Sequence, residues 1–192
     1  MDETPSQTAL RERLRAVGME LFRREGLRFT MQEAARAIHI SKKTIYAVYP
    51  SKEALLLDMV DDAFAQIHAR KQAILDGPGT LTDKLRAVII ALPEEYTALD
   101  LQQMDLLDEK YPRVAARVRQ HLETGWEPTL ALLQQAMEQG VIRTVSLPVL
   151  QRMISASIES FLADRTLEQQ GIPYAGALDE MMGILLDGLL IR

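Results

Sequence analysis

Hydrophobic residues recur at helical spacing along most of the chain. In residues 5–25, for example, Leu10, Leu14, Val17 and Leu21 follow the spacing i, i+4, i+7 and i+11, which places them on one face of an amphipathic helix. The alternation of apolar and polar residues that is typical of half-buried strands does not occur in residues 80–192. The pattern therefore predicts an all-α protein.

Residues 30–52 form two short helical patterns with a polar break between them and the start of a third helix behind. The first begins after Thr30, which with Glu33 has the spacing of a capping box. The second begins after Ser41, a preferred capping residue, and ends before Pro50, because proline disfavours helical geometry in the residue that precedes it. Two short helices joined in this way predict a helix-turn-helix.

The second short helix offers few side chains to a core and several to a nucleic acid. Its polar and basic side chains lie near the N-terminal end and on the outer face: Lys42, Lys43, Thr44 and Tyr46. A helix that enters the major groove by its N-terminus would bring these groups and its own amide dipole to DNA. The alternative is a solvated basic turn on an ordinary helical domain.

Further helices are predicted over the rest of the chain. A long one follows the capping residue Ser51 and ends at Gly77-Pro78-Gly79. The later ones are expected from Asp83 to about Leu92 with Thr82 as the cap, from Leu99 to Lys110, from Pro112 to Glu138, from Pro148 to about Leu167, and from Tyr174 to Leu190.

The charge is divided unevenly along the chain, whose formal net charge is −5. Residues 1–52 contain ten Lys or Arg and six Asp or Glu, a net charge of +4, whereas residues 53–192 contain twelve and twenty-one, a net charge of −9. A positive module suits a phosphate backbone, and an acidic body would be repelled from it. We therefore expect a DNA-binding domain at 1–52 and a regulatory and dimerisation domain at 53–192.

Composition excludes several classes of site. With no cysteine among 192 residues, the chain has no disulfide, thiolate metal site or Cys nucleophile. The three histidines are scattered without metal-ligand spacing, so we expect no catalytic residue, metal or cofactor, and no enzyme. No apolar run approaches the roughly 18 residues of a membrane span, and the start lacks the pattern of a signal peptide, so we expect a cytoplasmic protein without a membrane partner.

The first 60 residues or so resemble the TetR-type bacterial transcriptional regulators. The most specific pieces are Ser41-Lys42-Lys43-Thr44-Ile45-Tyr46 and Pro50-Ser51-Lys52-Glu53-Ala54-Leu55-Leu56, at their mutual spacing. The resemblance implies an N-terminal three-helix DNA-binding domain, with a family-type boundary near residue 60 inside the long helix, and a C-terminal helical domain for ligand binding and dimerisation. It also implies double-stranded DNA as the partner.

The resemblance assigns roles to individual side chains of the first domain. Thr30, Tyr46 and Lys52 are implied to contact phosphates, and Gln32, Lys42, Lys43 and Thr44 to meet base edges or the adjoining backbone. Each also has a structural alternative: Thr30 as a cap only, Tyr46 in packing and Lys52 solvated. The chain departs from the family at His39 and Lys43, where glycine is usual, and at Val48, where a ring is common. Histidine tolerates left-handed geometry, so we expect the turn at His39 to form.

In the second domain, the resemblance implies a small-molecule effector and a homodimer. Candidate pocket residues are Met59, Phe64, His68, Tyr96, Gln103, Met104, Trp126 and Met137, each of which could instead be ordinary core. Candidate interface residues, on the stripes of the last two helices, are Leu150, Ile154, Phe161, Leu178, Met181, Met182, Leu185 and Leu189; the alternative for them is burial inside one chain.

The function expected from these features is that of a sequence-specific regulator, a repressor released from a palindromic operator by an effector. The alternatives are a DNA-binding regulator without an effector, and a helical ligand- or partner-binding module without operator function.

Overall fold

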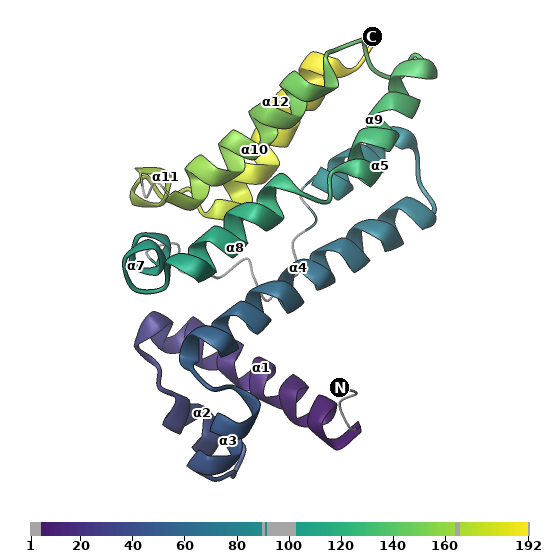
Figure 1. The fold of residues 1–192 in the computed structure, drawn as a ribbon. Coiled ribbons are helices and arrows are strands. Elements are labelled where there is room, and N and C mark those ends of the chain that lie inside the picture. Colours follow the sequence, from purple (N-terminus) through teal and green to yellow (C-terminus); the bar gives the residue numbers. More distant parts are fainter. Residues whose placement is uncertain (1–4, 90, 92–102, 164–165, 192) are drawn as a thin grey trace. The chain divides into compact units, whose positions relative to one another are not determined.

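The computed structural model describes residues 5–89, 91, 103–163 and 166–191, and their regular structure is helical apart from one isolated bridge between Ile142 and Leu190 (Figure 1). The all-α prediction is confirmed. The elements are α1 (Pro5–Glu25), η1 (Gly26–Arg28), α2 (Met31–Ala37), α3 (Lys42–Val48), α4 (Lys52–Asp76), α5 (Leu81–Ile89), α7 (Gln103–Lys110), α8 (Pro112–Glu123), α9 (Glu127–Glu138), α10 (Leu147–Ala163), α11 (Thr166–Gln169) and α12 (Tyr174–Leu189).

The chain forms two compact units. One comprises residues 1–63 and 98–118, and the other comprises residues 64–97 and 119–192. Helices α4 and α8 each contribute residues to both. The boundary that we predicted between residues 52 and 53 was meant to separate a DNA-binding domain from a regulatory domain, and this functional division remains a prediction.

The first unit is built around a core shared by α1, α2, α3 and the start of α4. Leu14 and Ile45 are fully buried in it, and Leu55 joins them from α4. From α7 and α8, Leu107 and Val114 belong to the same core. The two short helices of the helix-turn-helix are thus held by apolar packing, since helices of seven residues are too short to be stable alone.

Local capping fixes the ends of these short helices as predicted. The Thr30 side chain accepts from the Glu33 amide while the Glu33 carboxylate accepts from the Thr30 amide, which completes the capping box. Ser41 accepts from the Thr44 amide at 3.0 Å, and Ser51 accepts from the Ala54 amide at 3.1 Å. Between α2 and α3, His39 has a φ of +59°, so the expected left-handed turn is confirmed.

In the second unit, two predictions were wrong. The long helix expected from Pro112 to Glu138 is broken into α8 and α9, because Gly125 has a φ of +73° and Pro128 stands in the first turn of α9, where proline starts a helix. The cap of α5 is Thr80 in place of Thr82; its hydroxyl accepts from the Asp83 amide, and the helix starts two residues earlier than expected.

The core of the second unit joins α5, α9, α10 and α12. Its fully buried side chains include Leu85, Val88, Leu133, Ile154 and Met182. None of the described helices is long and apolar enough to cross a membrane.

Candidate functional site

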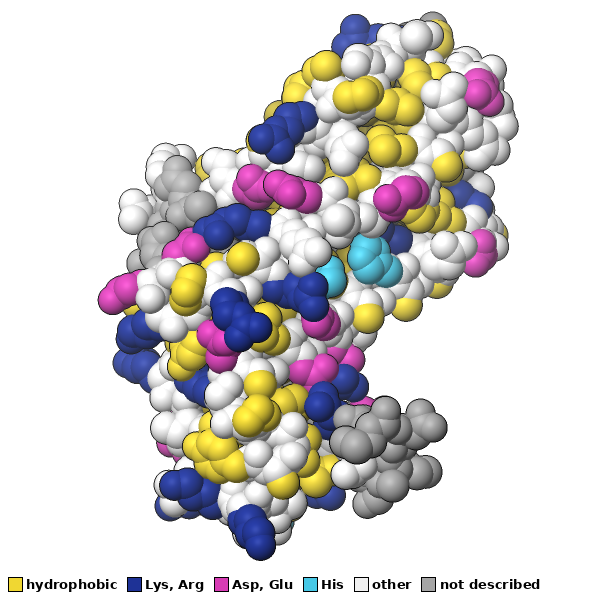
Figure 2. Space-filling model, in the orientation of Figure 1, with side chains coloured by type: hydrophobic (Ala, Val, Ile, Leu, Met, Phe, Trp, Pro, Cys, Tyr) yellow, Lys and Arg dark blue, Asp and Glu magenta, His cyan; other side chains and the backbone are white. Residues whose placement is uncertain are grey.

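Helices α2 and α3 expose polar side chains on the outer surface of the first unit. Gln32 on α2 and both Lys42 and Lys43 on α3 are exposed, and Tyr46 is exposed over 40% of its surface. Dark-blue Lys and Arg side chains mark this end of the unit in Figure 2. The sequence interpretation missed Arg36, which is exposed one helical turn after Gln32 and so shares its face of α2. The i, i+4 spacing of Gln32 and Arg36 in the sequence could have indicated this shared face.

The N-terminal end of α3 is a group of donors held by local bonds. The Lys42 ammonium lies 5.8 Å from the centre of the Tyr46 ring, which orients both side chains on the same face. The Thr44 hydroxyl is hydrogen-bonded to the Ser41 hydroxyl at 2.8 Å and is half-buried. Lys42, Lys43 and Tyr46 are therefore the side chains of α3 that are free to extend toward a nucleic acid.

Thr30 is exposed, yet its hydroxyl already has two bonds. It accepts from the Glu33 amide and donates to the Glu33 carboxylate at 2.8 Å. Hydrogen bonds from the Thr30 hydroxyl and amide hold the pKa of Glu33 below its usual value. A contact from Thr30 to a phosphate would require the hydroxyl proton to turn away from this carboxylate.

Lys52 points inward, which argues against the phosphate contact implied for it. Its ammonium donates to the carbonyl oxygens of Leu27, at 2.6 Å, and Phe29, and lies 4.1 Å from the centre of the Phe29 ring. Burial lowers the pKa of Lys52 to about 8. Two of its three donors are engaged, so in this conformation Lys52 ties the start of α4 to the segment between η1 and α2.

Asp58 joins three helices of the first unit. Its carboxylate accepts from the Tyr49 hydroxyl behind α3, and from the guanidinium groups of Arg11 at 3.3 Å and Arg15 at 3.4 Å on α1. Burial and the Asp58 carboxylate together raise the pKa of Tyr49. The network fixes the position of α4 relative to α1 and to the end of α3.

Two further ion pairs connect α4 to α8 within the first unit. Arg113 pairs with Glu53 at 2.9 Å, and Arg117 pairs with Asp61 at 3.0 Å. The first unit therefore includes a stretch of α8 that is joined to α4 by ion pairs.

The candidate pocket residues with described side chains are divided between the two units: Met59 belongs to the first, and Phe64, His68, Trp126 and Met137 belong to the second. Met59 is buried in the first unit, beside Gly18. Met137 packs on the core of the second unit and accepts from the Val145 amide through its sulfur at 3.3 Å. Tyr96 lies outside the described residues, and the side chains of Gln103 and Met104 are likewise not described.

The other three candidate pocket residues, Phe64, His68 and Trp126, lie near one another in the second unit. Phe64 stacks on His121 with ring centres 4.5 Å apart, His68 packs against Gly125, and the Lys71 ammonium lies 5.6 Å from the centre of the Trp126 ring. The sequence interpretation missed Lys71 and His121, although Phe64, His68 and Lys71 have the spacing of one face of α4.

Most of the candidate interface residues are buried in one chain. Leu150, Ile154, Leu178, Met182 and Leu189 are each at most 6% exposed, while Phe161, Met181 and Leu185 are half-buried. The five buried residues need no second subunit to be removed from water. Among the described side chains of α10 and α12, the large apolar ones that stay exposed are Val149, Met153 and Ile184, which line a hollow of about 450 Å³.

The described residues include no group of three or more His, Cys, Asp or Glu side chains that could hold a metal ion.

Comparison with known proteins finds a family model that matches the helix-turn-helix segment. Residues 14–59 match the model for bacterial regulatory proteins of the tetR family. Over 182 residues the chain is 26% identical to the HTH-type transcriptional regulator YvaF of Bacillus subtilis strain 168, covering 93% of this chain and 94% of that protein.

The similarity to solved structures extends over both units. FadR of Thermus thermophilus, described as a TetR family transcriptional repressor in complex with lauroyl-CoA, is 28% identical with a TM-score of 0.61, over 95% of this chain and 96% of that one. A transcriptional regulator from Cytophaga hutchinsonii has a TM-score of 0.73 at 15% identity, over 94% of this chain and 98% of its own, and supports the fold alone.

Proposed function

Because the chain belongs to the TetR family of bacterial transcriptional regulators and is a DNA-binding protein of that family, we propose that it acts as a homodimeric repressor that leaves a palindromic operator when a small-molecule effector binds. The observation that carries the proposal is the exposed, capped N-terminal end of α3, with Lys42, Lys43 and Tyr46 on its outer face.

In this proposal, α3 enters the major groove and the surrounding residues bind the backbone. Lys42 and Lys43 meet base edges or nearby phosphates, Tyr46 donates to a phosphate, and Gln32 and Thr44 contribute from the sides. Thr30 reaches a phosphate only by turning its hydroxyl away from Glu33, and Lys52 acts by positioning α4. Arg36 adds a cation beside Gln32.

For the dimer, we propose the exposed apolar face of α10 and α12. Val149, Met153 and Ile184 are each more than half exposed in one chain, and a second copy related by two-fold symmetry would cover them. Such a pair of subunits reads two half-sites of a palindrome.

For the effector, we propose an acyl-CoA. The support is the 28% identity to the Thermus thermophilus FadR over nearly the full length of both chains, since that repressor was solved with lauroyl-CoA. By linkage, the effector can weaken DNA binding only by its preference for the released conformation over the DNA-bound one.

The first experiment measures binding to a duplex taken from DNA beside the protein's own gene against a scrambled duplex, at several salt concentrations. Specific complexes usually exceed non-specific ones by about a thousandfold or more. Lys43→Ala and Tyr46→Phe are expected to weaken binding without changing the dimer, and Arg70→Ala, an exposed cation on the second unit's part of α4, serves as the control.

Equal affinity for both duplexes, with steep salt dependence, would leave only phosphate attraction for these sequences. The effector mechanism is tested by titrating lauroyl-CoA into the protein with and without operator. Equal affinities for lauroyl-CoA under the two conditions would refute the mechanism. A regulator without an effector would bind the operator specifically and ignore acyl-CoA.

A further inference from the structure

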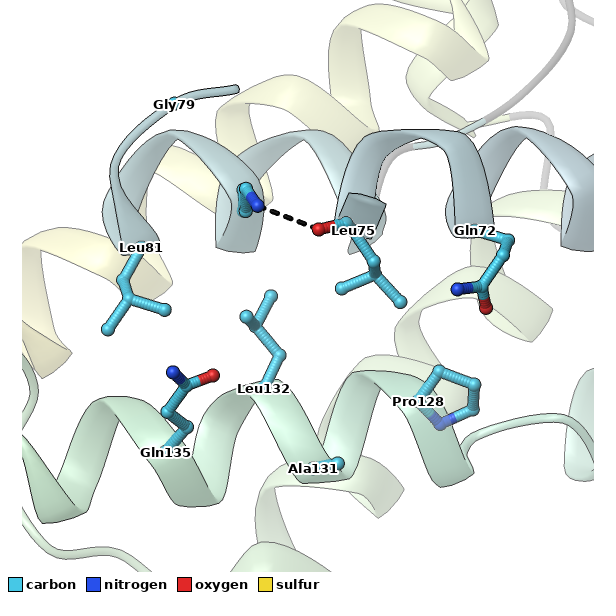
Figure 3. A pocket seen from close by; sticks show the side chains of 9 residues that line it. Gln72, Leu75, Gly79, Leu81, Pro128, Ala131, Leu132 and Gln135 are labelled. Atoms are coloured by element: carbon cyan, nitrogen blue, oxygen red, sulfur yellow. Dashed lines mark hydrogen bonds between the residues drawn. The ribbon is translucent and has the colours of Figure 1, made fainter. Parts of the chain in front are cut away.

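The described part of the second unit contains a groove between α4, α5 and α9 (Figure 3). Its volume is about 510 Å³, within the range of roughly 300–1,000 Å³ that is usual for small-molecule sites. Leu75, Leu81 and Leu132 extend into it from the three helices, with Gln72 and Gln135 at the sides. The Lys84 ammonium, also at the groove, donates to the Leu75 carbonyl oxygen at 2.7 Å.

Two of the helices that line the groove lead back to a group of basic side chains. On α4, His68, Gln72 and Leu75 have the spacing i, i+4 and i+7, so the lining face of the helix continues back to His68, with Lys71 beside it. On the other wall, Trp126 immediately precedes the start of α9, whose second residue, Pro128, lines the groove. Both walls therefore lead to the same cluster.

The cluster gathers three groups that carry or can gain positive charge. Burial, together with the charges of Lys71 and His121, lowers the pKa of His68. Burial also lowers the pKa of Lys71. Among the described residues, no carboxylate forms an ion pair with His68 or Lys71, and Glu127 is the acidic group that acts on His68.

Such an arrangement suits a bound anion. A negative group beside these side chains favours their protonated, charged forms, and their donors match carboxylate or phosphate oxygens. The neighbouring rings and the leucine-lined groove suit an aliphatic body attached to that group.

We propose that His68, Lys71 and His121 bind the anionic head group of an aliphatic ligand whose apolar body lies along the groove between α4, α5 and α9. The inference rests on the proposed function in taking this ligand to be the effector. A carboxylate of a fatty acid and the phosphates of an acyl-CoA share the required chemistry.

Trp126 provides the measurement, because it is the only tryptophan of the chain and Lys71 lies over its ring. Laurate, lauroyl-CoA, CoA alone and the neutral 1-dodecanol are titrated into the full-length protein while its fluorescence is recorded, and calorimetry gives an independent affinity. We expect saturable binding of laurate or lauroyl-CoA, and binding of 1-dodecanol at least about tenfold weaker. Binding of laurate identifies the carboxylate as sufficient, and binding of lauroyl-CoA alone identifies the phosphates.

Two variants locate the site, each with a matched control. Lys71→Met keeps the stem on the indole and removes the charge, so the affinity is expected to fall about tenfold or more, whereas Arg70→Met on the neighbouring face of α4 leaves it unchanged. Ala131→Phe narrows the groove and weakens binding, whereas Gln134→Phe, exposed elsewhere on α9, does not.

The proposal is overturned if none of the anionic ligands binds, if Lys71→Met and Ala131→Phe bind like the wild type, or if Arg70→Met loses as much affinity as Lys71→Met. Operator release separates this result from the proposed function. Binding at the site without release would leave the site standing and refute the effector mechanism. Equal release from the wild type and Lys71→Met would support the mechanism and refute this site.

Discussion

Some residues occupy environments or backbone conformations that their side chains do not favour by themselves. His39 has left-handed backbone geometry, Lys52 is a half-buried cation, and Thr129 is fully buried with a hydroxyl that has no hydrogen-bond partner among the described groups. Each is maintained by the residues around it, and for Lys52 and Thr129 this gives a prediction that separates local preference from context.

The ionisation of Lys52 should be visible in solution. Because burial lowers its pKa to about 8, from a usual value near 10.5, the folded protein binds fewer protons than the unfolded chain between these values. The stability that Lys52 contributes is therefore expected to rise as pH increases from 8 to 10.5. The difference in free energy of unfolding between the wild type and Lys52→Met measures it, and a flat difference across this window would contradict the prediction. An NMR titration of the Lys52 side chain should have its midpoint near pH 8.

Thr129 should tolerate removal of its hydroxyl. A buried polar group without a partner costs about 1–3 kcal/mol, and valine has the same shape without that group. We expect Thr129→Val to raise the free energy of unfolding by about 1 kcal/mol in chemical denaturation. Thr129→Ala is the control, because it also removes the hydroxyl but leaves a void. A lower stability for Thr129→Val would show that the hydroxyl is satisfied.

The helix caps were predictable because they depend on local chemistry, whereas the long-range contacts were not predictable. Thr30, Ser41 and Ser51 bond to amides three residues away, so their role could be inferred from the sequence alone. The carbonyl oxygens that hold Lys52 lie more than twenty residues before it. Spacing along one helix contains no information about such partners, so the inward position of Lys52 could not be predicted.

At the scale of elements, α4 is the helix on which other elements converge. Within the first unit its carboxylates reach α1 through Asp58 and Asp62, and α8 through Glu53 and Asp61. The course of α4 was predictable because Ser51 and the Gly77-Pro78-Gly79 turn bound it. The break between α8 and α9 was missed because Pro128 was treated as part of a continuing helix, although proline is favoured in the first turn of a helix.

Asp58 should matter more than its neighbours on α4. Replacing it with asparagine removes the charged acceptor that the Tyr49 hydroxyl and the guanidinium groups of Arg11 and Arg15 share, at an expected cost of about 2 kcal/mol in unfolding free energy. Asp61→Asn is the matched control; it breaks a pair whose partners are both 40% exposed, which is worth less than about 1 kcal/mol. Denaturation followed by circular dichroism compares the two, and equal losses would refute the central role of Asp58.

At the scale of the whole molecule, the exposed apolar side chains of α10 and α12 indicate which face a second copy would cover. Sequence periodicity selected the same two helices, but most of the residues that it chose pack inside one chain. Each helix is apolar over more than one face, and periodicity alone does not show which face is turned toward the core.

We therefore predict that Ile184→Glu abolishes the dimer, because it places a charge on an apolar side chain that is 68% exposed and lines the hollow between α10 and α12. Ile191→Glu makes the same change at an isoleucine that is 58% exposed beyond the end of α12, and it should leave the dimer intact. Sedimentation equilibrium distinguishes the two. A wild-type monomer at micromolar concentration, or dissociation of both variants, would contradict the proposed interface.

The arginines that bind the carboxylates of α4 have a consequence for how any DNA titration is interpreted. Arg11, Arg15, Arg113 and Arg117 hold the helix by partly exposed ion pairs, which dissolved ions screen. Raising the ionic strength would therefore weaken the packing of the first unit at the same time as it displaces the protein from DNA phosphates. The slope of affinity against salt would then overstate the number of phosphates contacted, unless it is corrected with the salt dependence of the free protein's own stability.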